Sequence, residues 1–344
     1  MKAFYIEAPN KITQKEINIA SLQSDEVLVK VFFVGLCGSD THLYKGSYGG
    51  PAGYPLLFGH EWSGMVEKVG ENVTTLKKGD KVTGDCSRFC GDCENCQIDK
   101  NLCSRIEKFG ITIDGASSEF IVRKEKHLYK APEDIALELL CLAEPVSVAF
   151  HLIDKIISRT GGLERKNILI LGAGSIGIAA LMLLKRRFRC RNVSQFDIAK
   201  NRTVLAQKLG ARILSPEDLI DGDHLSSYQA LYTAPKFDVV IESSGAPDAF
   251  TASINMVKPM GTVGCIGMIP EVRLNLKMVV TKALVIMGSI GGTGNFADSI
   301  DFINQNSQYV RQIISHQFTI DNTRKAFEIS RKTDDSLKVL LAFR

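Results

Sequence analysis

Apolar and polar positions divide the chain into two parts with different periodicity. Up to about residue 145, short strand-like runs such as Glu26 to Val34 and Ser63 to Val69 alternate with glycine, proline and aspartate, which predicts a β-rich region. The spacing becomes helical from Ala143 to Ile157, and strand-like and helix-like runs alternate afterwards. The predicted fold class is therefore α/β, with a β-rich part and a doubly wound parallel sheet.

The predicted sheet begins with a strand, Ile168 to Leu171, that is apolar on both faces. A helix-like segment from Ile178 to Leu184 and a second strand from Asn192 to Phe196 follow. Further strands are expected at Phe237 to Ile241, Gly261 to Ile266 and Ala283 to Met287, then a helix at Phe296 to Asn304 and a last strand at Lys338 to Phe343.

A glycine motif joins the first strand of this sheet to its helix. Gly172, Gly174 and Gly177 form G-x-G-x-x-G, and Ser175 and Ile176 open the helix. The helix N-terminus offers free N–H groups to an anion, and the glycines let a pyrophosphate approach the backbone. Asp197 ends the second strand, 20 residues after the last glycine, where a carboxylate can accept hydrogen bonds from a ribose. This βαβ context favours a dinucleotide site over an ordinary glycine-rich turn.

Composition narrows the choice of protein class only slightly. The 344 residues are 45% hydrophobic and 23% charged with a net charge of +4, which does not favour a nucleic-acid binder. The basic run from Lys185 to Arg191 is expected to be a solvated helix end. Because no apolar run has transmembrane length and the first residues lack a signal-peptide core, we expect a cytoplasmic enzyme without a membrane partner.

Five of the nine cysteines are packed between residues 86 and 103. Cys90, Cys93, Cys96 and Cys103 form C-x2-C-x2-C-x6-C, and in a reducing compartment such clustering indicates a metal rather than disulfides. Four thiolates suit a structural Zn²⁺ ion. An iron–sulfur cluster is an alternative, but its usual run places the fourth cysteine closer and follows it with proline.

A second set of possible ligands is dispersed along the chain. Cys37, His60, Glu61 and Glu144 offer one thiolate, one imidazole and two carboxylates, which together suit a catalytic zinc with an open position. Each residue alone has an ordinary structural explanation. Spacing in the sequence cannot establish that they converge.

These motifs resemble those of the zinc-dependent medium-chain dehydrogenase/reductases, in the sorbitol or polyol dehydrogenase branch. The resemblance spans nearly the whole chain and is carried, in the family's order, by Gly35–His42, Gly59–Glu61, the cysteine cluster, Glu144–Ala149 and Gly172–Gly177. It implies a GroES-like catalytic domain, residues 1–148 with a C-terminal return at 291–344, and a Rossmann NAD-binding domain at 149–290.

The resemblance also implies roles for individual residues. Cys37 and His60 would bind the catalytic zinc, with Glu61 and Glu144 as ligands or near-ligands. A carboxylate at position 144, where classical alcohol dehydrogenases have cysteine, favours the polyol branch. Ser39 would bind the substrate oxygen and begin a proton relay with His42 as its exit; the alternative for His42 is a surface or satisfied histidine. Tyr44 would either line the substrate cleft or pack in the core.

One departure from the family concerns the structural zinc. The family usually has seven residues between the last two cysteines of the cluster, and this chain has six. Cys86 is therefore an alternative to Cys103 as the fourth ligand. We expect two zinc ions per subunit.

Cofactor contacts are expected at further turns that follow strands. Ile266, Gly267 and Ser289 lie in two of these turns, and residues 242–245 form another, although each turn could simply reverse the chain. Asp197 favours NAD over NADP because it would repel a 2′-phosphate. Arg202 is interpreted as packing over the adenine or pairing with Asp197; the alternative is that it accommodates that phosphate.

The resulting hypothesis is a zinc- and NAD-dependent polyol dehydrogenase acting on a small-molecule alcohol to give a ketose. A sugar-phosphate polyol, threonine or diol dehydrogenase of the same family is the nearest alternative, and no basic residue near the motifs identifies a phosphate pocket. A non-catalytic dinucleotide sensor is the alternative from another class. We expect a homodimer or homotetramer, with the strand at Ala283 to Met287 able to pair across subunits.

Overall fold

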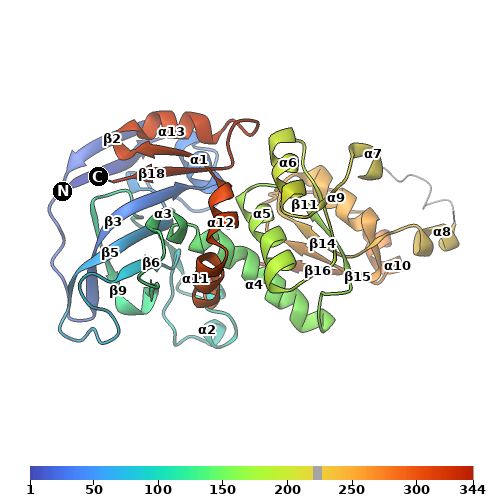
Figure 1. Cartoon of the computed structure of the whole chain (residues 1–344), viewed down its shortest axis with the longest axis horizontal. Coiled ribbons are helices and arrows are strands. Elements are labelled where there is room, and N and C mark those ends of the chain that lie inside the picture. The colour runs from blue at the N-terminus through green and yellow to red at the C-terminus, as the bar shows by residue number, and fades with distance from the viewer. Residues whose placement is uncertain (220–226, 344) are drawn as a thin grey trace. The chain divides into compact units, whose positions relative to one another are not determined.

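The computed structural model describes residues 1–219 and 227–343 and divides the chain into two compact units. Unit 1 comprises Met1–Ser147 and Gly291–Arg344, and unit 2 comprises Val148–Ile290 (Figure 1). Unit 1 is therefore built from two segments that are far apart in the sequence. In the described part of the chain, none of the helices is long and apolar enough to span a bilayer.

Unit 1 is predominantly β-structure. Its elements are β1 (Lys2–Ala8), β2 (Lys11–Glu16), β3 (Glu26–Leu36), α1 (Gly38–Lys45), β4 (Leu56–Leu57), β5 (Glu61–Val69), β6 (Lys81–Gly84), β7 (Ser87–Arg88), α2 (Glu94–Ile98), β8 (Glu107–Lys108), β9 (Phe120–Lys124), β10 (Leu128–Lys130), α3 (Leu137–Leu140), α11 (Phe296–Gln305), α12 (Ser307–Val310), β17 (Ile314–Thr319), α13 (Thr323–Ser330) and β18 (Lys338–Ala342). The first five residues of α4 (Ala143–Thr160) also belong to it.

The largest sheet of unit 1 joins its two segments. Its strand order is β10-β6-β5-β3-β18-β17, and β9 also pairs with β3. The strand β18 lies between β3, to which it is antiparallel, and β17, to which it is parallel. The C-terminal strand is thus an interior strand of the sheet that carries the N-terminal motifs.

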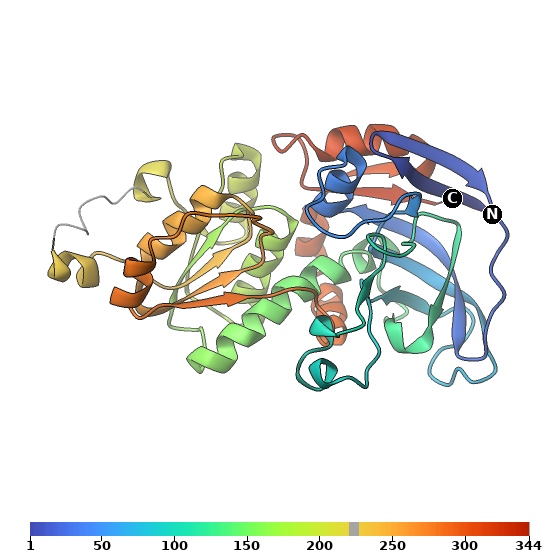
Figure 2. The ribbon, with the colours of Figure 1, turned by 180° about the vertical axis from the view of Figure 1, so that it is seen from behind.

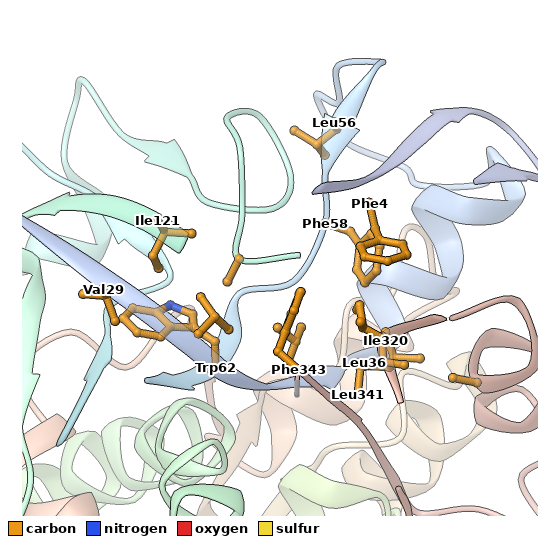
Figure 3. Close-up of a cluster of buried hydrophobic side chains, with 14 of the residues drawn as sticks. Phe4, Val29, Leu36, Leu56, Phe58, Trp62, Ile121, Ile320, Leu341 and Phe343 are labelled. Carbon is orange, nitrogen blue, oxygen red and sulfur yellow. The ribbon is translucent and has the colours of Figure 1, made fainter. Parts of the chain in front are cut away.

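The core of unit 1 lies against this sheet. Val27, Val29 and Val31 alternate along β3 and are fully buried, as expected for a strand with one face in the core. Figure 3 shows part of the same cluster, in which Trp62 lies close to Val29. Trp62, the only tryptophan of the chain, is 1% exposed and therefore reports on the folding of unit 1.

Unit 2 is a parallel sheet with helical crossovers. Its elements after α4 are β11 (Asn167–Leu171), α5 (Ser175–Met182) with a π-helical turn (Leu183–Arg187), β12 (Asn192–Phe196), α6 (Lys200–Lys208), β13 (Arg212–Ile213), α7 (Pro216–Leu219), α8 (Tyr228–Thr233), β14 (Phe237–Glu242), α9 (Pro247–Met256), β15 (Val257–Cys265), α10 (Leu276–Thr281) and β16 (Val285–Gly288).

The strand order of unit 2, β13-β12-β11-β14-β15-β16, is that of a Rossmann fold, with all neighbouring strands parallel. Right-handed crossovers that proceed in both directions from β11 place helices on both faces (Figures 1 and 2). Ligands of such sheets bind at the carboxyl ends of the strands, next to the point where the order reverses. Here that point lies between β11 and β14.

The limits of several predicted strands differ from the structure, as two of them illustrate. The strand expected at Ala283 begins at Val285, because Ala283 adopts a left-handed backbone conformation with φ of 49° directly after α10. The strand expected at Gly261 begins earlier, at Val257. Both differences lie at element ends, where periodicity is least informative.

Candidate active site

Three side chains expected to bind a catalytic metal lie together in unit 1. Cys37 precedes α1, His60 follows the Gly59 turn, and Glu61 begins β5. One potential ligand atom from each lies within 4.8 Å of the others, and His60 and Glu61 are buried. A thiolate, an imidazole and a carboxylate form a donor set that fits Zn²⁺ and leaves a coordination position for another ligand. The structure therefore brings together residues that the sequence separates.

Glu61 has a buried cationic partner that the sequence did not predict. The Lys338 ammonium group, on β18, donates hydrogen bonds to both carboxylate oxygens of Glu61 at 2.7 and 2.6 Å and to the Leu36 carbonyl at 3.3 Å. Neither side chain is more than 2% exposed. The one signal for Lys338 in the sequence is a charged residue at the start of an otherwise apolar strand.

Glu144 approaches the same cluster from the first turn of α4 and is 6% exposed. Burial raises the pKa of its carboxyl group, His60 opposes this rise, and Glu61 adds to it. The neighbouring Cys86 side chain also lowers this pKa. Glu144 is thus near the cluster, although it is not one of the three residues whose ligand atoms lie within 4.8 Å of each other.

Asp40, which sequence reasoning did not assign, holds the loops that carry the ligands. Its carboxylate accepts hydrogen bonds from the Cys37 N–H at 2.8 Å and the Gly59 N–H at 3.1 Å, and lies 3.8 Å from His60 Nδ1. Burial opposes the charge on His60, yet Asp40 and Cys37 raise the pKa of its imidazole well above the usual value. In the sequence, the only signal for this role of Asp40 was its position three residues after Cys37.

Ser39 and His42 both lie on α1 but differ in environment. Ser39 Oγ is buried and has no hydrogen-bond partner, so this hydroxyl is available to a ligand. His42 is exposed, and its Nδ1 lies 3.1 Å from Ser47 Oγ. Tyr44 packs on Phe327, with ring centroids 4.9 Å apart, which supports the core interpretation of Tyr44.

Tyr48, which was not singled out from the sequence, is influenced by two charged groups near the metal-ligand cluster. Burial raises the pKa of its phenol, and the charges of Cys37 and Asp40 raise it further. Both charges belong to the loop that carries the metal ligand Cys37.

Four thiols form a second cluster around the short helix α2. The Sγ atoms of Cys90 and Cys96 lie 3.8 Å apart, those of Cys93 and Cys103 3.9 Å, and those of Cys90 and Cys103 3.4 Å. Tetrahedral Zn–S bonds of about 2.3 Å place sulfur atoms about 3.8 Å apart, so the cluster fits a structural zinc ion. Although the spacing between Cys96 and Cys103 is shortened, Cys103 lies with the other three cysteines, and Cys86 does not.

Backbone donors add to this cluster. The N–H groups of Cys90 and Arg105 point at Cys103 Sγ, at 3.4 and 3.3 Å. Hydrogen bonds from Ser104 lower the pKa of Cys93 to about 5. Donors of this kind stabilise thiolates, the form in which cysteine binds a metal.

The glycine turn of unit 2 has the geometry needed to hold a pyrophosphate. Gly172 has φ of 99°, and a β-carbon there would lie 2.8 Å from the Ser244 nitrogen. A β-carbon at Gly177 would lie 2.2 Å from the Gly172 carbonyl oxygen, so glycine permits the helix to pack closely on the strand. Gly174 faces open space, with only an Arg202 nitrogen 4.0 Å away. Ser175 and Ile176 form the first turn of α5.

Asp197 is fixed at the end of β12 by backbone groups. Its two oxygens accept hydrogen bonds from the Ala173 N–H at 2.6 Å and the Ala199 N–H at 2.8 Å. The carboxylate is therefore held beside the glycine turn. Arg202 lies next to Gly174, on the same side of the sheet edge.

Two further turns lie at the carboxyl edge of the sheet. Ile266 and Gly267 follow β15, and Ser289 follows β16. The Ser289 N–H donates to the Cys265 carbonyl, and Ser289 Oγ is buried without a partner. Glu242, whose role was not predicted, accepts three hydrogen bonds from Ser244 and Gly245 and so shapes the neighbouring turn. A β-carbon at Gly267 would collide with its Oε2.

Comparisons with known proteins agree with these features. The chain matches the family model of the alcohol dehydrogenase GroES-like domain over residues 23–133 and that of the glucose dehydrogenase C-terminus over residues 138–343. It is 32% identical to D-xylulose reductase of Saccharomyces cerevisiae, over 95% of this chain and 93% of that protein.

Two solved structures are similar over nearly the whole chain. The RspB alcohol dehydrogenase of E. coli CFT073, complexed with NADH, has a TM-score of 0.88 and 27% identity, covering 100% of this chain and 99% of that one. A zinc-binding dehydrogenase of Sinorhizobium meliloti, bound to NADP, has a TM-score of 0.86 and 25% identity, covering 99% of both chains.

The chain belongs to the zinc-type medium-chain alcohol dehydrogenase family, in its polyol branch, and is an oxidoreductase. The resemblance inferred from the motifs is confirmed, and so is the predicted fold class, a GroES-like region with a Rossmann sheet. Zinc and a nicotinamide cofactor are expected for this family.

The four-cysteine cluster generates a prediction about metal content. Cys93→Ser should lower the zinc content by one ion per chain and reduce the unfolding midpoint, because the short loop around α2 has little apolar core of its own. Cys86→Ser is the matched control and should retain all the zinc, since Cys86 lies outside the cluster. If Cys86 replaced Cys103 as the fourth ligand, metal analysis by inductively coupled plasma mass spectrometry would show that Cys86→Ser loses one zinc ion as well.

The buried pair between Lys338 and Glu61 generates a prediction about stability. Lys338→Met leaves a buried carboxylate without its partner, and such a loss typically costs about 3–5 kcal/mol. We expect a loss of this size in urea unfolding followed by Trp62 fluorescence. The control Lys332→Met, at an exposed lysine, should change stability by less than about 0.5 kcal/mol. Equal stabilities of the two variants would contradict a stabilising role for the pair.

Proposed function

We propose that this enzyme oxidises a secondary hydroxyl group of a polyol or sugar alcohol to a ketone, with NAD as the hydride acceptor and two zinc ions per subunit. The observation that carries the proposal is the buried set of one thiol, one imidazole and one carboxylate at Cys37, His60 and Glu61, with the carboxyl group of Glu144 nearby. Membership of the polyol branch and the yeast D-xylulose reductase relative support it.

Cys37 and His60 would hold the catalytic zinc, with Glu61 or Glu144 supplying a carboxylate. A zinc ion there would act as a Lewis acid that lowers the pKa of a substrate hydroxyl group. Ser39 Oγ, buried and without a partner, would accept the proton of that hydroxyl while it releases its own, and the exposed His42 on the same helix would pass the released proton to solvent. Lys338 holds Glu61 in place and Asp40 holds the two loops.

The proposed cofactor contacts lie in unit 2. The N–H groups at Ser175 and Ile176 would bind the pyrophosphate, and Asp197 would accept hydrogen bonds from the adenosine ribose. Ile266, Gly267 and Ser289 contact the cofactor from the neighbouring turns. Arg202, beside Gly174, adds positive charge near the phosphates.

Substrate screening tests the proposal. Sugar alcohols, their phosphates, threonine and vicinal diols are supplied with NAD, and NADH formation is followed at 340 nm with product identification by mass spectrometry. A sugar alcohol giving a ketose at the highest kcat/KM supports the proposal. Preference for a phosphorylated polyol, threonine or a diol would move the enzyme to another activity of its family. Binding of NADH without oxidation of any alcohol would indicate a sensor.

Ser39→Ala tests the proposed proton relay. Loss of general base assistance typically slows a reaction about 10²- to 10⁴-fold, so we expect hydride transfer to slow within this range. Zinc content and NADH affinity should stay unchanged, because Ser39 is not assigned to either. Rapid-mixing kinetics with a substrate deuterated at the reacting carbon isolate hydride transfer, and an unaltered rate across pH would rule out the relay.

Asp197→Ser tests the choice of cofactor. The native enzyme should have a higher kcat/KM with NAD than with NADP, because a carboxylate repels the 2′-phosphate and binds the free hydroxyls. The variant should lose much of this preference, mainly through weaker NAD binding. A native preference for NADP would make Arg202, rather than Asp197, the residue that selects the cofactor.

We also propose that the enzyme assembles into a homodimer or homotetramer. The strand β16 lies at one edge of the unit 2 sheet, and Ile286 on it is 39% exposed. An exposed edge strand with an apolar side chain can pair with a second copy. Ile286→Lys should lower the mass measured by light scattering while the Trp62 unfolding transition is retained. A native monomer would refute this assembly.

A further inference from the structure

Unit 2 contains a pocket at the edge of its sheet opposite the glycine turn. The pocket encloses about 310 Å³, which lies at the lower end of the range of about 300–1,000 Å³ typical of small-molecule sites. Its lining includes Asn167 and Asn192, the first residues of β11 and β12, and Arg212, the first residue of β13. The pocket therefore lies at the amino ends of the strands, whereas the proposed cofactor turns follow their carboxyl ends.

The rim of this pocket carries excess positive charge. Arg191, Arg212 and Lys236 contribute three cations, and Asp218 is the one carboxylate among the lining residues that the structure describes. Within residues 1–219 and 227–343, these three cations form no ion pair within 4.0 Å. Asp218 Oδ2 already accepts hydrogen bonds from the Ser215 N–H at 2.8 Å and Oγ at 3.2 Å. The lining thus has a net charge of +2 that suits a dianion.

The cations are presented by a cross-linked frame. Asn192 Nδ2 donates to Asn167 Oδ1 at 3.0 Å, and Asn167 Nδ2 donates to the Lys236 carbonyl at 3.3 Å. The Lys185 ammonium group donates to the Arg191 carbonyl at 3.0 Å and so fixes the turn that presents Arg191. These hydrogen bonds fix the backbone at Arg191 and Lys236, two of the three residues that supply the cations.

The floor of the pocket is apolar. Val193, Leu214, Phe237 and Met256 line it and are all buried. An apolar floor below a cationic rim fits a small organic body that carries one dianionic group, and planar guanidinium groups bind phosphate in a bidentate manner. The basic run at the end of the first helix, expected to be only a solvated helix end, supplies two of the residues involved, Lys185 and Arg191.

We propose that this amino-edge pocket, formed around Arg191, Arg212 and Lys236, binds a small phosphorylated metabolite at a site separate from the dinucleotide and catalytic sites. The phosphate group lies between the three cations, and the organic part lies on the apolar floor. The ligand is bound without being transformed, because the catalytic metal ligands are not part of this pocket.

Phenyl phosphate is a suitable probe, because it has an apolar ring and a phosphate group that is largely dianionic above its second pKa of about 6. Isothermal titration into the full-length enzyme saturated with NADH, which blocks the dinucleotide site, should give one saturable event per chain. We expect Arg212→Ala to weaken binding at least tenfold and Lys236→Ala to weaken it to a similar extent. Affinity should fall as salt rises.

Arg165→Ala is the matched control, because Arg165 is an exposed arginine that precedes β11 but does not line the pocket. It should leave the affinity for phenyl phosphate within twofold of the native value. Thermal unfolding confirms that each variant is folded, and Arg191→Ala replaces any variant that is not. The proposal is overturned if phenyl phosphate does not saturate the enzyme, or if Arg165→Ala weakens binding as much as the pocket variants do.

Discussion

The buried ion pair between Lys338 and Glu61 is the interaction on which the catalytic unit depends. Two charges that are almost completely removed from water are tolerable only when each is the partner of the other, and here the ammonium group bonds both carboxylate oxygens. Because each buried charge requires the other, the strand β18, near the end of the chain, must lie beside the first residue of β5. Unit 1 must therefore be assembled from both ends of the sequence before its metal ligands are in place.

The same constraint explains how the ligands are oriented. Glu61 is held from one side by Lys338, while Asp40 holds the Cys37 and Gly59 backbones from the other. Ser39 Oγ, on the helix that follows Cys37, is left buried without a partner. Polar groups that lack partners inside a folded protein are costly and are retained mainly at functional sites, which is consistent with a hydroxyl group awaiting a ligand.

Much of the architecture could be predicted from the sequence, because local patterns carry it. The apolar strand before Gly172, the glycine spacing and Asp197 after the second strand belong to one βαβ unit of about thirty residues. The cysteine cluster is equally local. Periodicity could not connect the dispersed metal ligands with one another. The family resemblance connected them, because they follow the order of the family's motifs.

Long-range pairing was the part that the sequence could not reveal. Lys338 meets Glu61 across 277 residues, and no periodic pattern links them. The role of Glu242 could not be predicted, because its carboxylate accepts a hydrogen bond within the turn that follows its own strand. The amino-edge pocket could not be predicted either, since Arg191, Arg212 and Lys236 are ordinary surface cations until the parallel sheet brings the amino ends of β12, β13 and β14 to one edge.

The central claim is that one chain holds zinc at two chemically different sites. Anomalous diffraction from crystals of active enzyme, collected on both sides of the zinc absorption edge, tests it directly. The account predicts one peak between the sulfur atoms of Cys90, Cys93, Cys96 and Cys103 and a second beside Cys37 Sγ and the His60 ring. Active crystals without the second peak would contradict it.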